Sequence, residues 1–132
     1  MSTIFRSLAD DKLVEAILGG SIGVIPTDTV YGLIARTADK KAILRMYSLK
    51  KREQQPGTII AASVDQLISL GFPAEQLAAV AHLWPNPISV VLPAAGVAQY
   101  VKQSRTDLAV RIPKSQGLLD LLNLIGPVMT TV

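Results

Sequence analysis

Two hydroxyls and a carboxylate follow the first apolar run of this 132-residue sequence. Thr27, Asp28 and Thr29 come directly after residues 22–25 and Pro26. In an extended segment Thr27 and Thr29 face the same way, so both hydroxyls could hydrogen-bond one polar ligand. Strands of α/β folds end at ligand crevices, which favours a binding site here. A Thr/Asp-rich turn that only caps the next element explains the same residues.

A cluster of cations, Lys50, Lys51 and Arg52, follows a predicted helix. If the chain has left the helix by Lys50, then Lys50 and Arg52 project to one side and Lys51 to the other. Such a pair suits a polyphosphate, because Lys supplies a point charge and Arg a two-pronged donor. The helix dipole alone also favours cations at this end, by about 0.3–1 kcal/mol each.

Arg111 stands among apolar residues near the end of the predicted strand 108–113. Burying its charge requires a partner, either a structural ion pair or an anionic ligand. The sequence has one histidine, His82, and no cysteine. We therefore expect no disulfide, no thiolate metal site and no metal or catalytic role for His82.

Apolar periodicity and capping residues predict the elements that position these side chains. Asp39 can cap a helix that runs to about residue 49, and Ser63 and Gln66 have the spacing of a capping box. Segment 93–106 is expected to be a loop with a short helical turn. The expected helices are 12–18, 39–49, 63–71, 73–84 and 116–125, and the expected strands are 22–25, 58–62, 88–92, 108–113 and 128–132. Their alternation predicts one α/β domain.

Composition narrows the class of protein. Hydrophobic residues make up 49% of the chain, and no apolar run approaches the roughly 18 residues that span a membrane. We therefore expect a cytoplasmic protein without a signal peptide. The net charge of +3 suits an anionic ligand or a loose association with RNA. The sequence has neither a GxGxxG motif nor a P-loop.

Five segments in order resemble the YrdC-like family, the threonylcarbamoyl-AMP synthases. Residues 26–33 resemble its PT(D/E)TxYGL signature, and Lys50 to Arg52 resemble its Lys-x-Arg motif. Residues 84–89 are similar to its WPGPxT segment, with Asn86 for the Gly and Ser89 for the Thr. Residues 110–113 resemble its VRxP segment, and residues 126–128 the run before its Ser-x-Asn motif.

This resemblance implies a mixed twisted sheet with flanking helices and a basic central groove. It also implies synthesis of threonylcarbamoyl-AMP and pyrophosphate from L-threonine, bicarbonate and ATP, with Mg²⁺. The product would serve the threonylcarbamoyl modification of adenosine 37 in tRNA, with tRNA and tRNA-modification factors as partners. By motif, Lys50 and Arg52 would be the catalytic residues that hold the triphosphate. The substrate-binding residues would be Thr27, Thr29, Tyr31, Arg111, Thr130 and Thr131.

The sequence departs from the family at its end. Val132 stands at or just before the Ser of Ser-x-Asn, so we expect a single YrdC-like domain, residues 1–132, without the family's C-terminal part. Three alternatives stay open: a relative that forms a carbamoyl-adenylate from carbamoyl phosphate, a non-catalytic RNA-binding module, and a truncated or degenerate member without activity.

Overall fold

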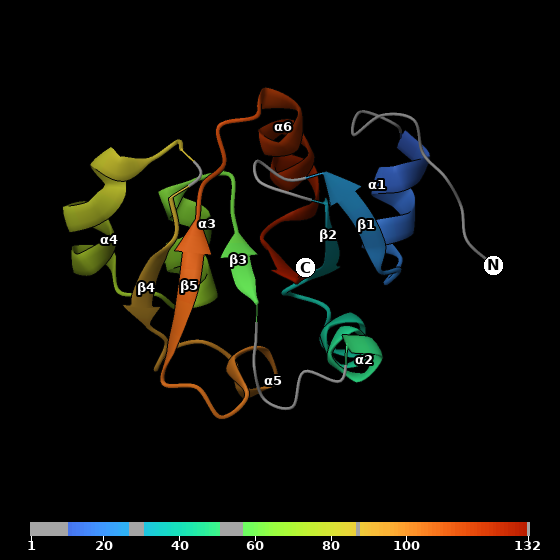
Figure 1. Cartoon of the computed structure of the whole chain (residues 1–132), viewed down its shortest axis with the longest axis horizontal. Coiled ribbons are helices and arrows are strands. Elements are labelled where there is room, and N and C mark those ends of the chain that lie inside the picture. Colours follow the sequence, from blue (N-terminus) through green and yellow to red (C-terminus); the bar gives the residue numbers. More distant parts are fainter. Residues whose placement is uncertain (1–10, 27–30, 51–56, 87, 132) are drawn as a thin grey trace.

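A computed structural model describes residues 11–26, 31–50, 57–86 and 88–131. Six strands form one sheet in the order β1-β2-β6-β3-β5-β4 (Figure 1). Only β3 and β5 are parallel, and the other neighbouring pairs are antiparallel. β1 and β5 tilt in opposite directions in Figure 1, as expected for a twisted sheet. The strands are β1 (Gly23–Pro26), β2 (Tyr31–Arg36), β3 (Thr58–Ile60), β4 (Val90–Pro93), β5 (Asp107–Arg111) and β6 (Val128–Thr131).

Side-chain caps fix where several helices begin. The carboxylate of Asp39 accepts a hydrogen bond from the Ala42 amide at 3.1 Å, and the hydroxyl of Ser63 accepts one from Gln66 at 3.2 Å. Ser115 caps the last helix in the same way, through the Leu118 amide at 3.3 Å. The helices are α1 (Asp11–Leu18), α2 (Lys40–Lys50), α3 (Val64–Leu70), α4 (Ala74–Val80), the 3-10 helix η1 (Ala81–Leu83), α5 (Gln99–Lys102) and α6 (Gln116–Ile125).

One glycine pair fixes the path of the chain after α3. Gly71 ends that helix with a φ of +123°, a conformation that side chains rarely adopt. A Cβ atom at Gly71 would also clash with the backbone carbonyl of Gly96. The close approach of the two backbones therefore requires both residues to lack a side chain.

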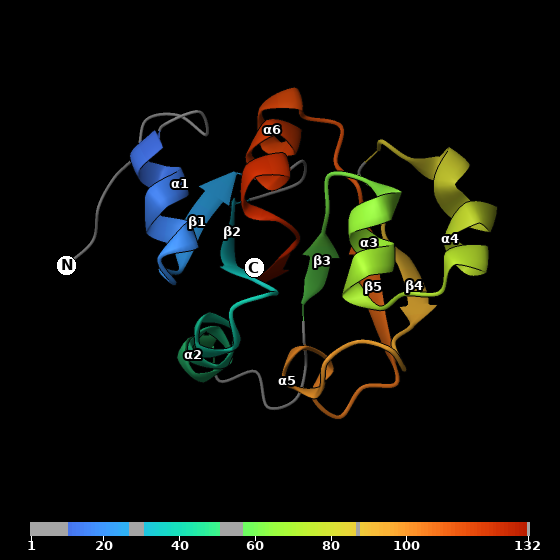
Figure 2. The same cartoon turned by 180° about the vertical axis from the view of Figure 1, so that it is seen from behind.

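The two faces of the sheet carry separate apolar cores. Ala35, Ile59, Val110 and Met129 belong to the first core, which the helices α2, α3, α4 and α5 cover. Ile34, Ile60 and Val128 belong to the second core, with the inner faces of α1 and α6. Figure 2 shows α3 in front of β5, and Figure 1 shows no helix across β3, β5 and β4 on the opposite side. The described helices of the second face therefore lie over one half of the sheet only.

The predicted α/β fold with a mixed sheet is confirmed, with corrections at element ends. β2 was not predicted as a strand, and Pro26, expected to stop the first strand, is its last residue. β3 ends at Ile60 rather than residue 62, and β4 begins at Val90 rather than residue 88. Within the described ranges, no helix is long and apolar enough to cross a membrane.

Candidate functional site

Two threonines lie side by side on the half of the sheet face that no described helix covers. Thr130 of β6 pairs with Thr58 of β3, which pairs in turn with Ala109 of β5. Directly paired residues share a face, so both threonine side chains project from the face that also carries Ile34 and Ile60. Thr130 is only 8% exposed, and Thr58 is half-buried.

Arg111 projects from the same face. It lies two residues beyond Ala109 in β5 and pairs with Ile60, and its exposed fraction is 6%. From Thr58, this places Arg111 roughly 7 Å along the strands and one strand across the sheet. The predicted strand-end arginine is therefore buried, and it shares a face with two hydroxyls.

The topology also brings the flanks of two sequence motifs to one end of the sheet. β1 and β2 form an antiparallel pair that closes with Pro26 opposite Tyr31, so Thr27 and Thr29 belong to the connection between these strands. Leu33 of β2 pairs with Thr131 of β6, two residues from Tyr31. The strand after the Lys-x-Arg motif begins at Thr58, opposite Thr130. Chain segments far apart in sequence thus meet around the end of β6.

Several predicted site residues lie wholly or partly outside the described residues. Thr27, Asp28, Thr29 and Arg52 lie wholly outside them. For Tyr31, Lys50 and Thr131 the backbone is described, but the side chains are not. Tyr31 begins β2, Lys50 is the last residue of α2, and Thr131 is the last of β6. The helix thus includes Lys50, one residue beyond its predicted end.

Two tyrosines fix the last turn of α2 and the loop before that helix. The Tyr47 hydroxyl donates to the carbonyl of Val101 in α5 at 2.6 Å, and the Tyr100 hydroxyl donates to the carbonyl of Thr37 at 2.6 Å. Burial raises the pKa of Tyr47 well above its ordinary value. The two bonds hold α5 against both ends of α2, and Tyr47 lies one turn before Lys50.

The tryptophan turn packs beside the end of β5. The indole Nε1 of Trp84 donates to the carbonyl of Ile88 at 2.7 Å, and the amide of Asn86 donates to the carbonyl of Ile112 at 3.3 Å. Ile112 follows Arg111 directly, so the segment that resembles WPGPxT adjoins the segment that resembles VRxP. The carbonyl of Ile88 is engaged in this turn, and β4 begins two residues later, at Val90.

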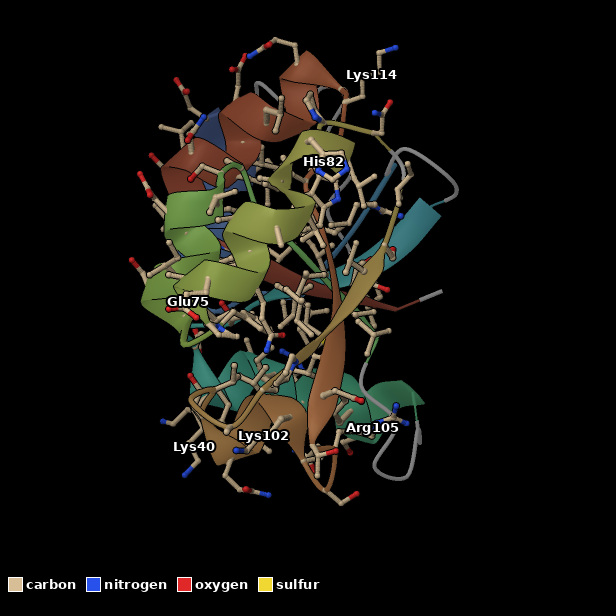
Figure 3. The ribbon with its side chains drawn as sticks, turned by 90° about the vertical axis from the view of Figure 1, so that its left-hand side faces the viewer. Lys40, Glu75, His82, Lys102, Arg105 and Lys114 are labelled. Atoms are coloured by element: carbon tan, nitrogen blue, oxygen red, sulfur yellow. The ribbon has the colours of Figure 1, made fainter. Side chains whose placement is uncertain are left out.

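The described residues hold no obvious resident metal site. Among them, no group of three or more His, Cys, Asp or Glu side chains could bind an ion. His82 is exposed on η1, at the opposite end of the molecule from Lys40, Lys102 and Arg105 in Figure 3.

Sequence reasoning missed Thr58. It was assigned only to a buried strand, because Ile59 and Ile60 follow it. Alternation places Thr58 and Ile60 on one face of the strand and Ile59 on the other. A strand of three residues cannot show which of these faces the helices cover. The pairing with Thr130 supplies that information.

Comparison with known proteins identifies the family. The model of the Sua5, YciO and YrdC proteins, described as telomere recombination, matches residues 15–132. A threonylcarbamoyl-AMP synthase of Pyrococcus abyssi is 36% identical over 109 residues, which cover 80% of this chain and 32% of that protein. One of Vibrio cholerae is 32% identical over 126 residues, which cover 91% of this chain and 67% of that protein.

Solved structures agree with this assignment. P. abyssi Sua5 complexed with L-threonine gives a TM-score of 0.78 at 31% identity, over 91% of this chain and 37% of that one. E. coli YciO, at 21% identity, has the same fold, with a TM-score of 0.74 over 92% of this chain and 61% of that one. The chain spans about a third of the P. abyssi synthase and about two thirds of the V. cholerae synthase. Since the family model matches most of its length, the chain belongs to the Sua5/YciO/YrdC family.

Proposed function

We propose that this protein is a threonylcarbamoyl-AMP synthase, a nucleotidyltransferase that uses L-threonine, bicarbonate and ATP. The observation that carries the proposal is the placement of the buried residues Arg111 and Thr130 on one face of the sheet. Arg111 belongs to the segment that resembles the VRxP motif, and Thr130 follows the run that resembles the one before the Ser-x-Asn motif. The relatives named threonylcarbamoyl-AMP synthase, at 32–36% identity, support the same reaction.

The chemistry makes modest demands on acid–base groups. The amine of threonine and bicarbonate condense to a carbamate with loss of water. A carbamate oxygen then attacks the α-phosphorus of ATP, and the bond to pyrophosphate breaks as the new oxygen–phosphorus bond forms. Positioning of three substrates and neutralisation of phosphate charge dominate such a reaction. A site without histidine or cysteine can therefore carry it.

Each motif residue has a role in this scheme. Arg111 binds the carboxylate of threonine or a phosphate as a two-pronged donor, and Thr130 lines the face beside it. Lys50 and Arg52 hold the triphosphate. Thr27, Thr29, Tyr31 and Thr131 contribute to the substrate pocket, in the basic groove that the family resemblance implies.

Magnesium enters this scheme with the ATP substrate. Mg²⁺ in nucleotide sites is bound mainly through phosphate oxygens, water and one or two carboxylates. The described part of the chain offers no acidic cluster for a resident ion, so we assign none of its residues to the metal. The adenylate product would then serve tRNA modification in the cytoplasm, through a separate transfer factor.

The first test is a reaction analysed by mass spectrometry. The purified chain is incubated with ATP, Mg²⁺, bicarbonate and L-threonine, and each is omitted in turn. We expect threonylcarbamoyl-AMP and pyrophosphate only in the complete mixture. A parallel reaction replaces threonine and bicarbonate with carbamoyl phosphate, and an adenylate formed only there would assign the carbamoyl-adenylate reaction instead. No adenylate in either mixture, from folded protein, would refute the proposed activity.

A further inference from the structure

The two hydroxyls of Thr58 and Thr130 are available for a ligand. Within the part of the chain that the structure describes, neither hydroxyl hydrogen-bonds to protein, although Cβ atoms of directly opposed residues lie only about 4.5–5.5 Å apart. Thr130 is 8% exposed, and Thr58 beside it is half-buried.

Their surroundings define the chemistry of that ligand. Ile34 and Ala109 flank the pair in the same row, and Ile60 lies one step along β3. These side chains are apolar, whereas Arg111, beyond Ala109, is a cation. Arg36 shares this face, and its Nε donates to the carbonyl of Ile125. A small ligand with a carboxylate at one end and a neutral or cationic hydrogen-bonding group at the other fits this arrangement. An α-amino acid has this form.

We infer that Thr58 is a further substrate-binding residue of this protein. Its hydroxyl, with that of Thr130, contacts the amine or side-chain hydroxyl of the bound amino acid, while Arg111 takes the carboxylate. The inference rests on the proposed function, because it deepens the assignment of the threonine pocket. It adds a residue from β3, which none of the sequence motifs contains.

A structural role for the Thr58 hydroxyl is the competing explanation. Threonine favours strands through its branched Cβ, and valine has the same branching and nearly the same volume. Thr58→Val therefore removes the hydroxyl and retains the strand preference, whereas Thr58→Ser retains the hydroxyl. Thr106→Val is the matched control, since Thr106 is an exposed threonine just before β5.

The experiment measures binding rather than turnover. Titration calorimetry with L-threonine, with L-2-aminobutyrate and with ATP is performed on the wild-type chain and the three variants. We expect Thr58→Val to weaken threonine binding about tenfold, as for loss of one hydrogen bond in a desolvated site, with ATP binding and the melting temperature unchanged. Thr58→Ser and Thr106→Val should bind threonine within about twofold of wild type, a margin well below one lost hydrogen bond.

The second amino acid tells which group is contacted. If Thr58→Val weakens threonine but not 2-aminobutyrate, Thr58 contacts the side-chain hydroxyl. If both are weakened equally, it contacts the amine. Unchanged threonine affinity in Thr58→Val would overturn the inference while leaving the proposed function intact. Equal loss of threonine and ATP binding with a lower melting temperature would assign Thr58 a structural role. A wild-type chain that binds no threonine would instead count against the proposed function.

Discussion

At the scale of single residues, the notable feature is a charge placed where the sheet would otherwise be apolar. Arg111 is 6% exposed and is preceded by Val110, a residue of the first core, on the opposite face. Because side chains alternate along β5, Arg111 projects from the face of the second core and Val110 from the face that the helices of the first core cover. Keeping a guanidinium so buried is expensive unless charged or polar groups meet it. A site for an anionic substrate is one such arrangement.

The first residue-scale prediction concerns this guanidinium. Arg111→Met removes the charge and the two-pronged donor but retains a long side chain, so we expect adenylate formation to fall at least 100-fold. Arg111→Lys should restore only part of the activity, because lysine cannot donate in the planar fork. Rates are measured as pyrophosphate release, with unfolding by urea as the check on folding.

Arg105 provides the matched control for that prediction. It precedes β5 at the opposite end of the strand, forms an exposed ion pair with Asp107 at 3.5 Å, and lies at the same end of the molecule as Lys102 in Figure 3. Exposed pairs contribute little, so Arg105→Met should retain activity and nearly all stability. Equal activity in Arg111→Met and Arg105→Met would remove Arg111 from the site.

At the scale of elements, the short helix α5 determines how α2 sits. α5 has only four residues, yet it accepts the hydrogen bond of Tyr47 from α2 and donates that of Tyr100 to Thr37, in the loop before α2. The ammonium of Lys102 donates to the carbonyls of Ala94 and Ala95 at 3.2 Å, which fixes α5 to the end of β4. The C-terminal turn of α2, with Lys50, is thereby tied through α5 to the sheet.

The prediction at this scale uses the pKa of Tyr47. Tyr47→Phe should lower the free energy of unfolding by about 1–2 kcal/mol at pH 7, because the carbonyl of Val101 loses its donor. Burial raises the pKa of Tyr47 in the folded state, so its contribution is fully present below the unfolded tyrosine pKa, about 10, and is lost as pH rises further. The difference between wild type and Tyr47→Phe should therefore shrink above about pH 10.

Urea unfolding from pH 7 to pH 11 measures both parts of this prediction. Tyr100→Phe is the control at pH 7, since it removes a hydrogen bond of the same length between the same two regions. A difference between wild type and Tyr47→Phe that stays constant across this range would show that Tyr47 is not buried as described.

Elements with their own start and stop signals could be predicted from the sequence. α6 matches its predicted bounds of 116–125, because Ser115 caps it and Gly126 ends it with a φ of +85°. β2 could not be predicted, since its first residues, Tyr31 and Gly32, belonged to the signature that was assigned to a turn. Its strand character comes from pairing with β1 and β6, which only tertiary structure supplies.

The candidate site was predictable in part for the same reason. Arg111 stood out because a charge interrupts an apolar run, and Thr130 because its segment resembles a family motif. That the two share a face depends on register across β6, β3 and β5, which involves residues more than 20 positions apart. Thr58 entered only through this register. Local patterns thus identified the residues but could not place them together.

At the scale of the whole molecule, the sheet separates two cores that differ in what they support. The first core joins the sheet to α2, α3, α4 and α5, and it contains the single tryptophan, Trp84. The second joins the other face to α1 and α6 and ends where the uncovered half begins. Two hydrogen bonds connect the end of β2 to the end of α6. The Nε of Arg36 donates to the carbonyl of Ile125 at 2.8 Å, and the hydroxyl of Thr37 donates to the carbonyl of Pro127 at 2.9 Å.

This arrangement predicts one cooperative unit, because β2, β3 and β6 each contribute side chains to both cores. Ile17→Val, in α1 and the second core, should cost about 0.5–1.5 kcal/mol, as should Ile43→Val in α2 and the first core. Separated by the sheet, the two losses should add in the double variant to within about 0.5 kcal/mol.

Urea unfolding is followed by Trp84 fluorescence and by far-ultraviolet circular dichroism. Trp84 reports the first core directly, so the informative variant is Ile17→Val. If the molecule unfolds as one unit, a lost methylene group on the far face must move the fluorescence midpoint as much as the dichroism midpoint. A dichroism shift without a fluorescence shift would mean that the α1–α6 layer unfolds separately. The face that carries Thr58 and Arg111 would then lie at a boundary between two folding units.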